Sequence, residues 1–396
     1  MLSWEYPPHV VGGLGKHVAD LVPALGRQGV EVHLLTPRWA GGKLEESLEG
    51  GGSVYRLDPP AAGEGDSIHT VAWQANAILE ERAHQLWGAL GGFDLIHVHD
   101  WLVSFAGGAL KHAFKTPLIS TIHATERGRG RGALPSPMAR TIDHTEWWLT
   151  YESWRVICCS AFMKGEVHNF FNLPEDKIDV IPNGVNVPQY PSGDVESLAH
   201  FRSMYALPTE QIVISVGRIV AEKGVHVLLA AVPRVLAVFP SAKFVVVGVG
   251  PMLEELRRMA WELGVNEKVL FTGFIPDEDR DRLYRVADCA VFPSLYEPFG
   301  IVALEAMAHR CPVVVSDIGG LREVVTHGQT GVTCYPGDPG SVAWAILHTL
   351  QHPEWTQQRV EAAYRQVRDE YNWDRIAGLT LGVYGRVVGE RKRTAW

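Results

Sequence analysis

Short, continuous runs of Val, Ile and Leu recur along the chain and alternate with segments of helical periodicity. The runs occupy residues 31–36, 94–100, 117–124, 155–160 and 178–184 in the first half, and 211–217, 243–248, 268–273, 289–294 and 312–317 in the second. Because their apolar residues are consecutive, they are typical of strands buried on both faces, as in parallel sheets covered by helices. The sequence therefore predicts an α/β fold with doubly wound parallel sheets.

The length of the chain and one break in its pattern predict two domains. A chain of 396 residues exceeds the usual size of a single core. The periodicity lapses in PNGVNVPQYPSGD, residues 182–194, where turn-forming residues gather. We predict Rossmann-like domains over 1–185 and 186–372, and a C-terminal helix over 373–396 that returns to the first domain. Ligands of such sheets bind beyond the carboxyl ends of the strands, so we expect two facing domains with a cleft between them.

Composition and charge exclude several classes of partner. The net charge is −9 and the basic residues are scattered, so we expect no nucleic-acid partner. No apolar run approaches the roughly 18 residues of a transmembrane helix, and we expect a cytoplasmic protein. The five cysteines form no CxxC pair, which favours buried thiols over disulfides or a zinc site. The Gly-rich segment 40–52 indicates a mobile surface loop.

Two segments place anion-binding groups after predicted strands. In VGGLGKHV, residues 11–18, Gly12 and Gly13 let backbone amides approach an anion at the start of a helix. A tight turn without a ligand is the alternative. Arg218 and Lys223 leave the end of another predicted strand, and this pair of cations suits a diphosphate because Arg binds two oxygens and Lys adds a compact charge. Two solvated surface charges are the alternative there.

The segment EPFGIVALE places two carboxylates around the start of a helix. If the helix begins near Phe299 or Gly300, Glu297 lies on the preceding loop and Glu305 lies inside, about 9–12 Å away along the axis. This spacing suits the two ends of an extended ligand. The free amides of Phe299, Gly300 and Ile301 would lie between the acids, placed for a negative group. A helix whose acids only favour its dipole is the alternative.

These motifs, in this order, resemble the retaining GT-B glycosyltransferases of glycosyltransferase family four. The resemblance rests on EPFGIVALE after CAVFPSLY, on GRIVAEKG, on the GGLG turn and on PNGV, and it covers essentially the whole chain. SWEYPPHVVGGLGKHV, HATERGRGRG and EWWLTYESWRVICCS are similar to the branch that includes glycogen-synthase-like α-1,4-glucosyltransferases. The resemblance implies a hexosyltransferase that moves a glucosyl unit from UDP-glucose or ADP-glucose to a saccharide acceptor, an α-1,4-glucan or oligosaccharide.

The resemblance also implies roles for residues of the second half. Arg218 and Lys223 match the cations that bind the diphosphate, and Glu305 matches the acid that binds the donor ribose. Glu297 matches the acid beside the transferred sugar, and Ser294 has a counterpart just before it. The amides of residues 299–301 belong to the same donor site.

In the first half, Gly12 and Gly13 match the loop over the phosphates, and His123 matches the histidine that faces the sugar from the other domain. Asp100 in HVHDW corresponds to an acid that lines the same cleft in the glycogen-synthase-like group.

Two departures from the family pattern limit this transfer. Starch and bacterial glycogen synthases have a lysine just before the paired glycines, whereas Val10 and Val11 stand here. This difference favours family four over the synthase family. Relatives usually have several residues before the segment that matches SWEYPP, so the resemblance implies a first strand that begins upstream of Met1.

The residues favour a reaction that needs no metal. Arg218, Lys223 and helix amides can stabilise the leaving diphosphate as charge develops on it. No DxD-like acidic pair stands at a strand end, and His97 with His99 lacks a third ligand, so we favour packing for these two histidines. The resemblance implies same-face substitution, in which the donor phosphate takes the proton of the acceptor.

Three other functions stay open on this sequence. A family-four hexosyltransferase could act on a lipid-linked or small-molecule acceptor. A sugar-nucleotide epimerase of the same fold would also use phosphate-binding cations and acids, but it lacks the E-x7-E arrangement. A nucleotide-binding protein without catalysis is a third possibility. A radiolabelled donor would distinguish transfer, epimer release and binding without turnover.

Overall fold

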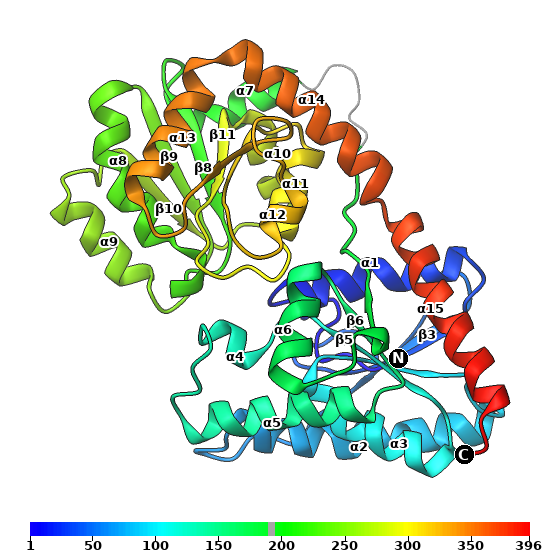
Figure 1. Cartoon of the computed structure of the whole chain (residues 1–396). Coiled ribbons are helices and arrows are strands. Elements are labelled where there is room, and N and C mark those ends of the chain that lie inside the picture. The colour runs from blue at the N-terminus through cyan, green and yellow to red at the C-terminus, as the bar shows by residue number, and fades with distance from the viewer. Residues whose placement is uncertain (189–194) are drawn as a thin grey trace. The chain divides into compact units, whose positions relative to one another are not determined.

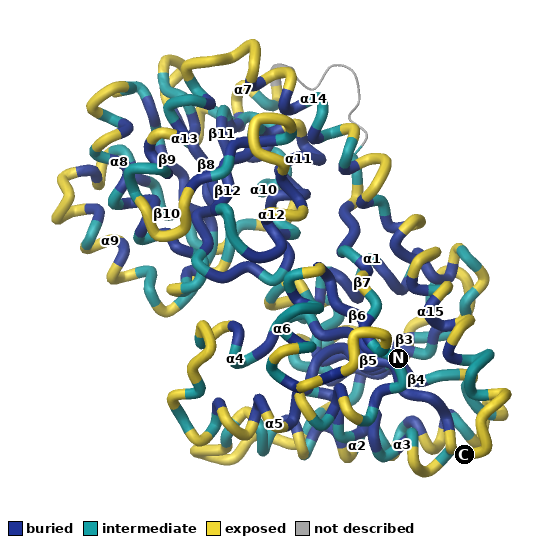
Figure 2. Tube along the Cα trace, in the orientation of Figure 1, coloured by how far each residue is buried: buried dark blue, intermediate teal, exposed yellow. Residues whose placement is uncertain are grey.

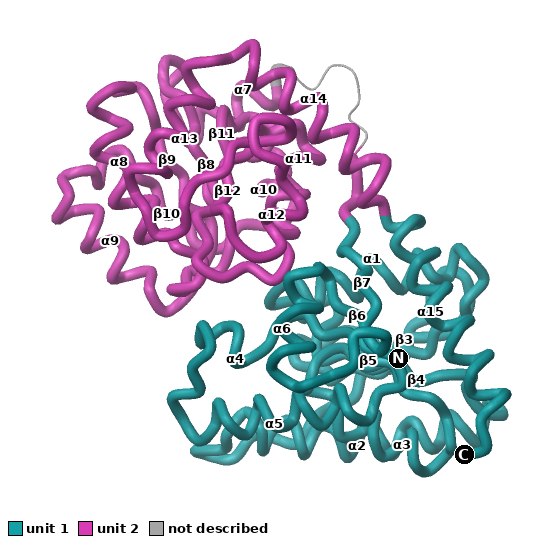
Figure 3. Tube along the Cα trace, in the orientation of Figure 1, with its two compact units in different colours: residues 1–184, 373–396 teal, residues 185–372 magenta. Residues whose placement is uncertain are grey.

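Each apolar run that predicts a strand forms one in the computed structural model, which describes residues 1–188 and 195–396. The chain divides into two units (Figure 3): the first contains Met1–Gly184 and Trp373–Trp396, and the second contains Val185–Asn372. Both units have helices around parallel sheets, so the predicted α/β class is confirmed. Part of the expected boundary, residues 189–194, lies outside the described residues.

The first unit contains these strands: β1 (Val32–Pro37), β2 (Glu45–Ser47), β3 (Gly52–Leu57), β4 (Ile96–His99), β5 (Leu118–Ile122), β6 (Arg155–Cys158) and β7 (Ile178–Val180). Its helices, traced in Figure 1, are α1 (Gly13–Arg27), α2 (Ile68–Leu90), η1 (Trp101–Val103), α3 (Ser104–Phe114), α4 (Glu126–Arg129), α5 (Pro137–Glu152), α6 (Ala161–Phe171), η2 (Glu175–Lys177) and α15 (Trp373–Arg393).

Leu2 joins the two halves of the first sheet. β1 pairs with β3, and β4, β5, β6 and β7 follow one another in parallel. Leu2 makes parallel bridges to Leu35 of β1 and to Val98 of β4, so the start of the chain lies between these strands. The loops after Leu2 and after β4 therefore leave the middle of the sheet at its carboxyl edge.

The second unit contains the strands β8 (Gln211–Val216), β9 (Ala242–Val247), β10 (Val269–Gly273), β11 (Cys289–Phe292), β12 (Val313–Ser316) and β13 (Val332–Cys334). Its helices are α7 (Val195–Ser203), η3 (Ala221–Lys223), α8 (Val225–Val238), α9 (Leu253–Glu262), α10 (Asp277–Val286), α11 (Ile301–Ala308), α12 (Leu321–Val324), α13 (Pro339–Gln351) and α14 (Pro353–Glu370). The sheet order is β10-β9-β8-β11-β12-β13, all parallel. This is the Rossmann order.

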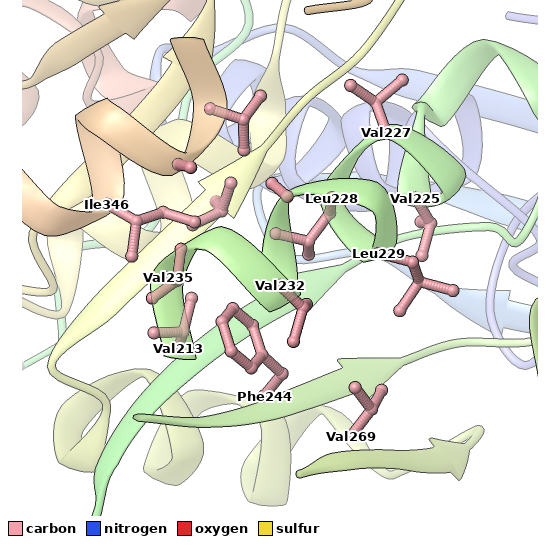
Figure 4. Packing of buried hydrophobic residues seen from close by; sticks show 14 of the residues in the cluster. Val213, Val225, Val227, Leu228, Leu229, Val232, Val235, Phe244, Val269 and Ile346 are labelled. Atoms are coloured by element: carbon pink, nitrogen blue, oxygen red, sulfur yellow. The ribbon is translucent and has the colours of Figure 1, made fainter. Parts of the chain in front are cut away.

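Each unit has its own apolar core. In the second unit, Leu228 and Val232 of α8 pack with Val213 of β8 and Phe244 of β9, and all four side chains are buried (Figure 4). In the first unit, α15 contributes buried residues such as Ile376 to the cluster that contains α1 and β1. The buried strands run through the middle of each unit in Figure 2, as the continuous apolar runs predict.

One feature differs from the expectations. The segment 40–52, expected as a mobile loop, contains β2, which pairs antiparallel with β3. All three β2 residues are exposed, so solvent on both faces leaves no apolar pattern in the sequence. The five cysteines are free and buried, which confirms the expectation of thiols. Within the described residues, no helix is both long and apolar enough to cross a membrane.

Candidate functional site

The predicted cations and acids of the second unit lie where its strand order reverses. β8 and β11 are neighbours in the sheet. From β8 the chain continues to β9 on one side, and from β11 it continues to β12 on the other side. Arg218 and Lys223 follow β8, whereas Ser294 and Glu297 follow β11. A crevice at such a switch point is where doubly wound sheets bind ligands.

Lys223 and Glu297 form an ion pair at this switch point. Lys223 Nζ donates to Glu297 Oε2 at 2.7 Å, and Ser294 Oγ donates to the same oxygen at 3.1 Å. Glu297 is 6% exposed, so its carboxylate depends on these two donors for the solvation that water would provide. The structure thus brings together three predicted residues that lie up to 74 positions apart in the chain.

Arg218 lines the same recess but contacts a different acid. The recess is bounded by Gly217, Arg218, Lys223, Ser294 and Glu297 among others. The Arg218 guanidinium lies 3.3 Å from a Glu222 oxygen, and half of its side chain is exposed. An exposed pair of this kind is weak, so the guanidinium can turn to a stronger anion at small cost.

Gly224 lets the two loops pack closely. Its φ is +68°, and a Cβ there would stand 2.0 Å from the carbonyl oxygen of Pro293. The turn that ends η3 therefore rests directly on the backbone after β11. This contact sets the separation of Lys223 from Glu297.

Helix α11 begins at Ile301, one residue later than expected, and Gly300 precedes it with φ +111°. Within the described part of the chain, the amides of Phe299, Gly300 and Ile301 donate no hydrogen bond. Free amides at a helix start favour an anion. Glu305 is buried inside the helix, with Oε2 3.9 Å from the Arg280 guanidinium of α10.

In the first unit, Asp100 has an unusual backbone. Its φ is 59° and its ψ is 178°, a region that glycine occupies almost exclusively. Its Oδ1 accepts a hydrogen bond of 2.7 Å from the backbone amide of His123. Burial raises the pKa of Asp100 to about 7. Strain of this kind persists where the surrounding structure holds it, which is common at functional sites.

Three histidines from different elements meet beside Asp100. His17 comes from α1, His99 ends β4, and His123 follows β5. His99 Nδ1 lies 3.1 Å from His123 Nε2, and the ring of His17 lies 4.8 Å from that of His123. Burial lowers the pKa of His17 to about 4 and the pKa of His99 and His123 well below the usual value. All three imidazoles are therefore neutral near pH 7.

His97 belongs to a separate set of contacts. Its ring nitrogens lie 2.6 Å from the hydroxyl oxygen of Tyr384 and 2.8 Å from that of Thr121. These bonds tie α15 to the sheet, which is the packing role expected for His97. His99 differs, because it belongs to the cluster with His17 and His123. These two residues are the further metal-ligand candidates that the sequence around His97 and His99 does not contain.

The glycine turn before α1 holds an internal carboxylate. Glu5 Oε2 accepts hydrogen bonds from the amides of Val11 and Gly12, at 2.8 and 3.1 Å. Gly13 is the first residue of α1. The turn therefore binds an anionic group, as the motif predicts, but that group is the carboxylate of Glu5. A donor phosphate that binds the same amides has to displace Glu5.

A sizeable cavity of the first unit lies away from these residues. A cavity of about 610 Å³ is lined by residues before β1 and β4, such as Gly29 and Phe93. These are the amino ends of the strands, opposite the edge at which Asp100 and His123 lie. Doubly wound sheets bind their ligands at the carboxyl edge, so this cavity has no part in the candidate site.

Comparisons with known proteins cover both units. Residues 11–189 match the model of Glycosyltransferase Family 4, and residues 200–366 match that of Glycosyl transferases group 1. An uncharacterized glycosyltransferase of Methanocaldococcus jannaschii is 40% identical, and the match covers 97% of each chain. The chain belongs to the family-four, group 1 glycosyltransferases.

Two further relatives extend the comparison. The glycogen synthase of Mycobacterium tuberculosis is 36% identical over 97% of this chain and 93% of its own. The solved sucrose-phosphate synthase of Thermosynechococcus elongatus is 25% identical, with a TM-score of 0.83 and 98% of each chain covered. The GT-B fold predicted by resemblance is thereby confirmed, and the chain is a glycosyltransferase that uses a nucleotide-sugar donor.

Three side chains of this glycosyltransferase that contact candidate site residues were not predicted from the sequence: Glu5, His17 and Arg280. Glu5 follows a chain start without periodicity, and Arg280 stands in the charged segment DEDRD, which reads as an exposed helix. His17 follows the GGLG turn in α1, so its position one turn inside the helix is the only available signal.

Proposed function

We propose that the chain is a retaining glucosyltransferase. It moves a glucosyl unit from UDP-glucose or ADP-glucose to the non-reducing end of an α-1,4-linked glucan or oligosaccharide. The observation behind this proposal is the Lys223–Glu297 ion pair at the switch point of the second sheet, with Arg218 on the same recess. The 36% identity with a glycogen synthase supports the sugar and the acceptor.

The second unit holds the diphosphate. Arg218 binds two of its oxygens, Lys223 binds a third, and the free amides of Phe299 and Gly300 face the same charge. When the donor arrives, Lys223 is shared between Glu297 and the phosphate. These fixed charges and dipoles stabilise the leaving group without a metal ion. Glu305 binds the ribose hydroxyls.

The reaction replaces one bond at the anomeric carbon by another on the same face. The bond from the anomeric carbon to the phosphate oxygen breaks, and the acceptor hydroxyl oxygen forms the new bond. The proton of that hydroxyl passes to the released phosphate oxygen, so the α configuration is retained. Glu297 and His123 contact the sugar, and Asp100 fixes the backbone of His123 through the 2.7 Å hydrogen bond.

The acceptor has one supported alternative. The name of the related sucrose-phosphate synthase indicates a small sugar phosphate as its product, and that chain is 25% identical over 98% of this one. A small-molecule acceptor therefore remains the second candidate. Both candidates share the donor site in the second unit.

A donor and acceptor panel tests the proposal. The enzyme is incubated with UDP-, ADP- and GDP-glucose and with maltooligosaccharides or small sugar phosphates, and products are identified by mass and anomeric coupling. The expected product is a maltooligosaccharide longer by one α-linked glucose. A β-linked product would contradict retention, and extension of a sugar phosphate alone would replace the glucan by the second candidate.

Two variants test the ion pair itself. Lys223→Met removes a charge-assisted hydrogen bond of about 1.5–3 kcal/mol, so nucleotide affinity should fall roughly 10- to 150-fold. Glu297→Gln should not lower that affinity, because it removes the charge that competes for Lys223, and should lower kcat instead, because Glu297 contacts the sugar. Calorimetry with UDP and ADP and steady-state kinetics measure both. Equal loss of nucleotide affinity in the two variants would show a purely structural pair.

A further inference from the structure

The histidine cluster of the first unit has the composition of a metal site. His17, His99 and His123 each offer one ring nitrogen, and these three atoms lie within 4.8 Å of one another. They are held by α1, by the end of β4 and by the segment after β5, all within one unit. Three histidines with an open fourth position are a ligand set that zinc adopts in proteins.

Two nitrogens of the cluster are buried without a partner. Among the described residues, Nε2 of His17 and Nε2 of His99 have no hydrogen-bond partner, although the two residues are only 4% and 0% exposed. A buried polar atom without a partner costs about 1–3 kcal/mol, so packing alone does not account for this arrangement. A ligand that accepts the lone pair of His17 would remove part of that cost.

Asn183 orients His17 for such a ligand. The Nδ1 of His17 lies 2.7 Å from Asn183 Oδ1, and because an amide oxygen only accepts, Nδ1 carries the proton. The lone pair of His17 is therefore on Nε2. Metal-binding histidines commonly use their second nitrogen in this way to fix tautomer and ring orientation.

The spacing of the other two histidines also fits. The 3.1 Å between His99 Nδ1 and His123 Nε2 is close to the roughly 3.3 Å between two nitrogens bound to tetrahedral zinc at about 2.0–2.1 Å. His17 has to move toward this pair to complete the set, since the three atoms span up to 4.8 Å. His123 is only partly buried, which provides a path for the ion.

We propose that His17, His99 and His123 bind a Zn²⁺ ion, with water as the fourth ligand. The ion occupies the first unit and takes no part in the stabilisation of the diphosphate by the second unit. If His123 contacts the donor sugar, as the proposed function holds, the bound ion occupies the Nε2 of His123, which then no longer contacts the sugar. Zinc then acts as a reversible inhibitor of transfer.

Binding is tested on the full chain after treatment with EDTA and removal of the chelator. Calorimetry with Zn²⁺ should give one ion per chain. Co²⁺ should give the intense visible bands of a tetrahedral site, whereas adventitious six-coordinate binding gives weak bands. No binding, or only weak Co²⁺ bands, would overturn the proposal.

Variants locate the site. His17→Gln and His99→Gln should lower zinc affinity by at least about 100-fold, and Asn183→Leu by about 10- to 100-fold, because it removes the orienting bond. His84→Gln, a change at a half-exposed histidine of the same unit, serves as the matched control and should bind zinc as the wild type does. Melting curves exclude unfolded variants. Unchanged affinity in folded His17→Gln and His99→Gln would refute the site.

Transfer assays separate this inference from the proposed function. Zinc should inhibit the wild type. The zinc concentration that halves the rate should be at least about tenfold higher for His17→Gln, with each rate compared with the rate of the same protein in EDTA. One zinc per chain that depends on the histidines but leaves turnover unchanged would support the site and refute the role of His123. Inhibition that is equal in both proteins would refute the histidine site as its cause.

Discussion

The backbone of Asp100 makes a prediction that reverses the usual order of glycine and alanine. With φ 59° and ψ 178°, Asp100 occupies a region that is open to glycine and strained for other residues. Asp100→Gly and Asp100→Ala both remove the carboxylate that accepts the hydrogen bond from His123. The loss of this bond is common to the two variants and cancels in their comparison.

The expected difference follows from two opposing contributions. Strain in this region costs about 1–3 kcal/mol, and Ala keeps it while Gly removes it. A glycine also makes the unfolded chain more flexible, which lowers the free energy of unfolding by about 0.5–1 kcal/mol relative to alanine. Asp100→Gly should therefore be more stable than Asp100→Ala, by up to about 2.5 kcal/mol.

Urea unfolding of both variants measures the difference. Arg258 in α9 provides a control, since its side chain is 70% exposed in a regular helix. There, Gly should be less stable than Ala by about 1 kcal/mol. The reasoning is wrong if Asp100→Gly is the less stable variant of its pair. Both Asp100 variants should lose turnover, because the strain holds a residue that the reaction uses.

Three further predictions concern other parts of the fold. Gly224→Ala should lower the free energy of unfolding in urea by at least about 1–2 kcal/mol more than Gly264→Ala. The two glycines have nearly the same φ (+68° and +67°), but only at Gly224 would a Cβ meet Pro293. Equal losses would contradict the close contact. The buried cysteines should not react with a thiol reagent in the native protein, and all five should react in guanidinium. Burial lowers the pKa of His17 to about 4, so this residue contributes stability above about pH 6.5 that is lost as the pH falls toward 4. In EDTA, wild type should lose about 3 kcal/mol more than His17→Gln over this interval, and parallel pH profiles would refute it.

The sequence predicts the fold well where strands are buried on both faces. β8, β9, β11 and β12 each contain a run of at least three consecutive apolar residues, which is typical of strands buried on both faces. β2 escapes prediction because its three residues are exposed, and β13 because three residues are too few to establish a pattern. The pairing of Leu2 with β1 and β4 also leaves no local signal, since it consists of two bridges around a single residue.

The candidate site is predicted unevenly for a physical reason. In the second unit, Lys223 and Glu297 stand on loops directly after adjacent buried strands, so the strand order alone brings them to one edge. In the first unit, His17 stands on the inner face of α1 and meets Asn183, which is 166 residues away. Only the packing of the helix against the sheet determines that contact.

The two units also differ in how their charges are balanced. In the second unit, the buried Glu297 is matched by Lys223, so an incoming diphosphate competes with a carboxylate for one cation. In the first unit, the amides before α1 are matched by Glu5, so an incoming anion competes with a carboxylate for two donors. Each candidate anion site is thus held by an internal acid until a ligand replaces it. Such placeholders keep the groups oriented and lower the cost of the unliganded state, because no buried charge stays unpaired.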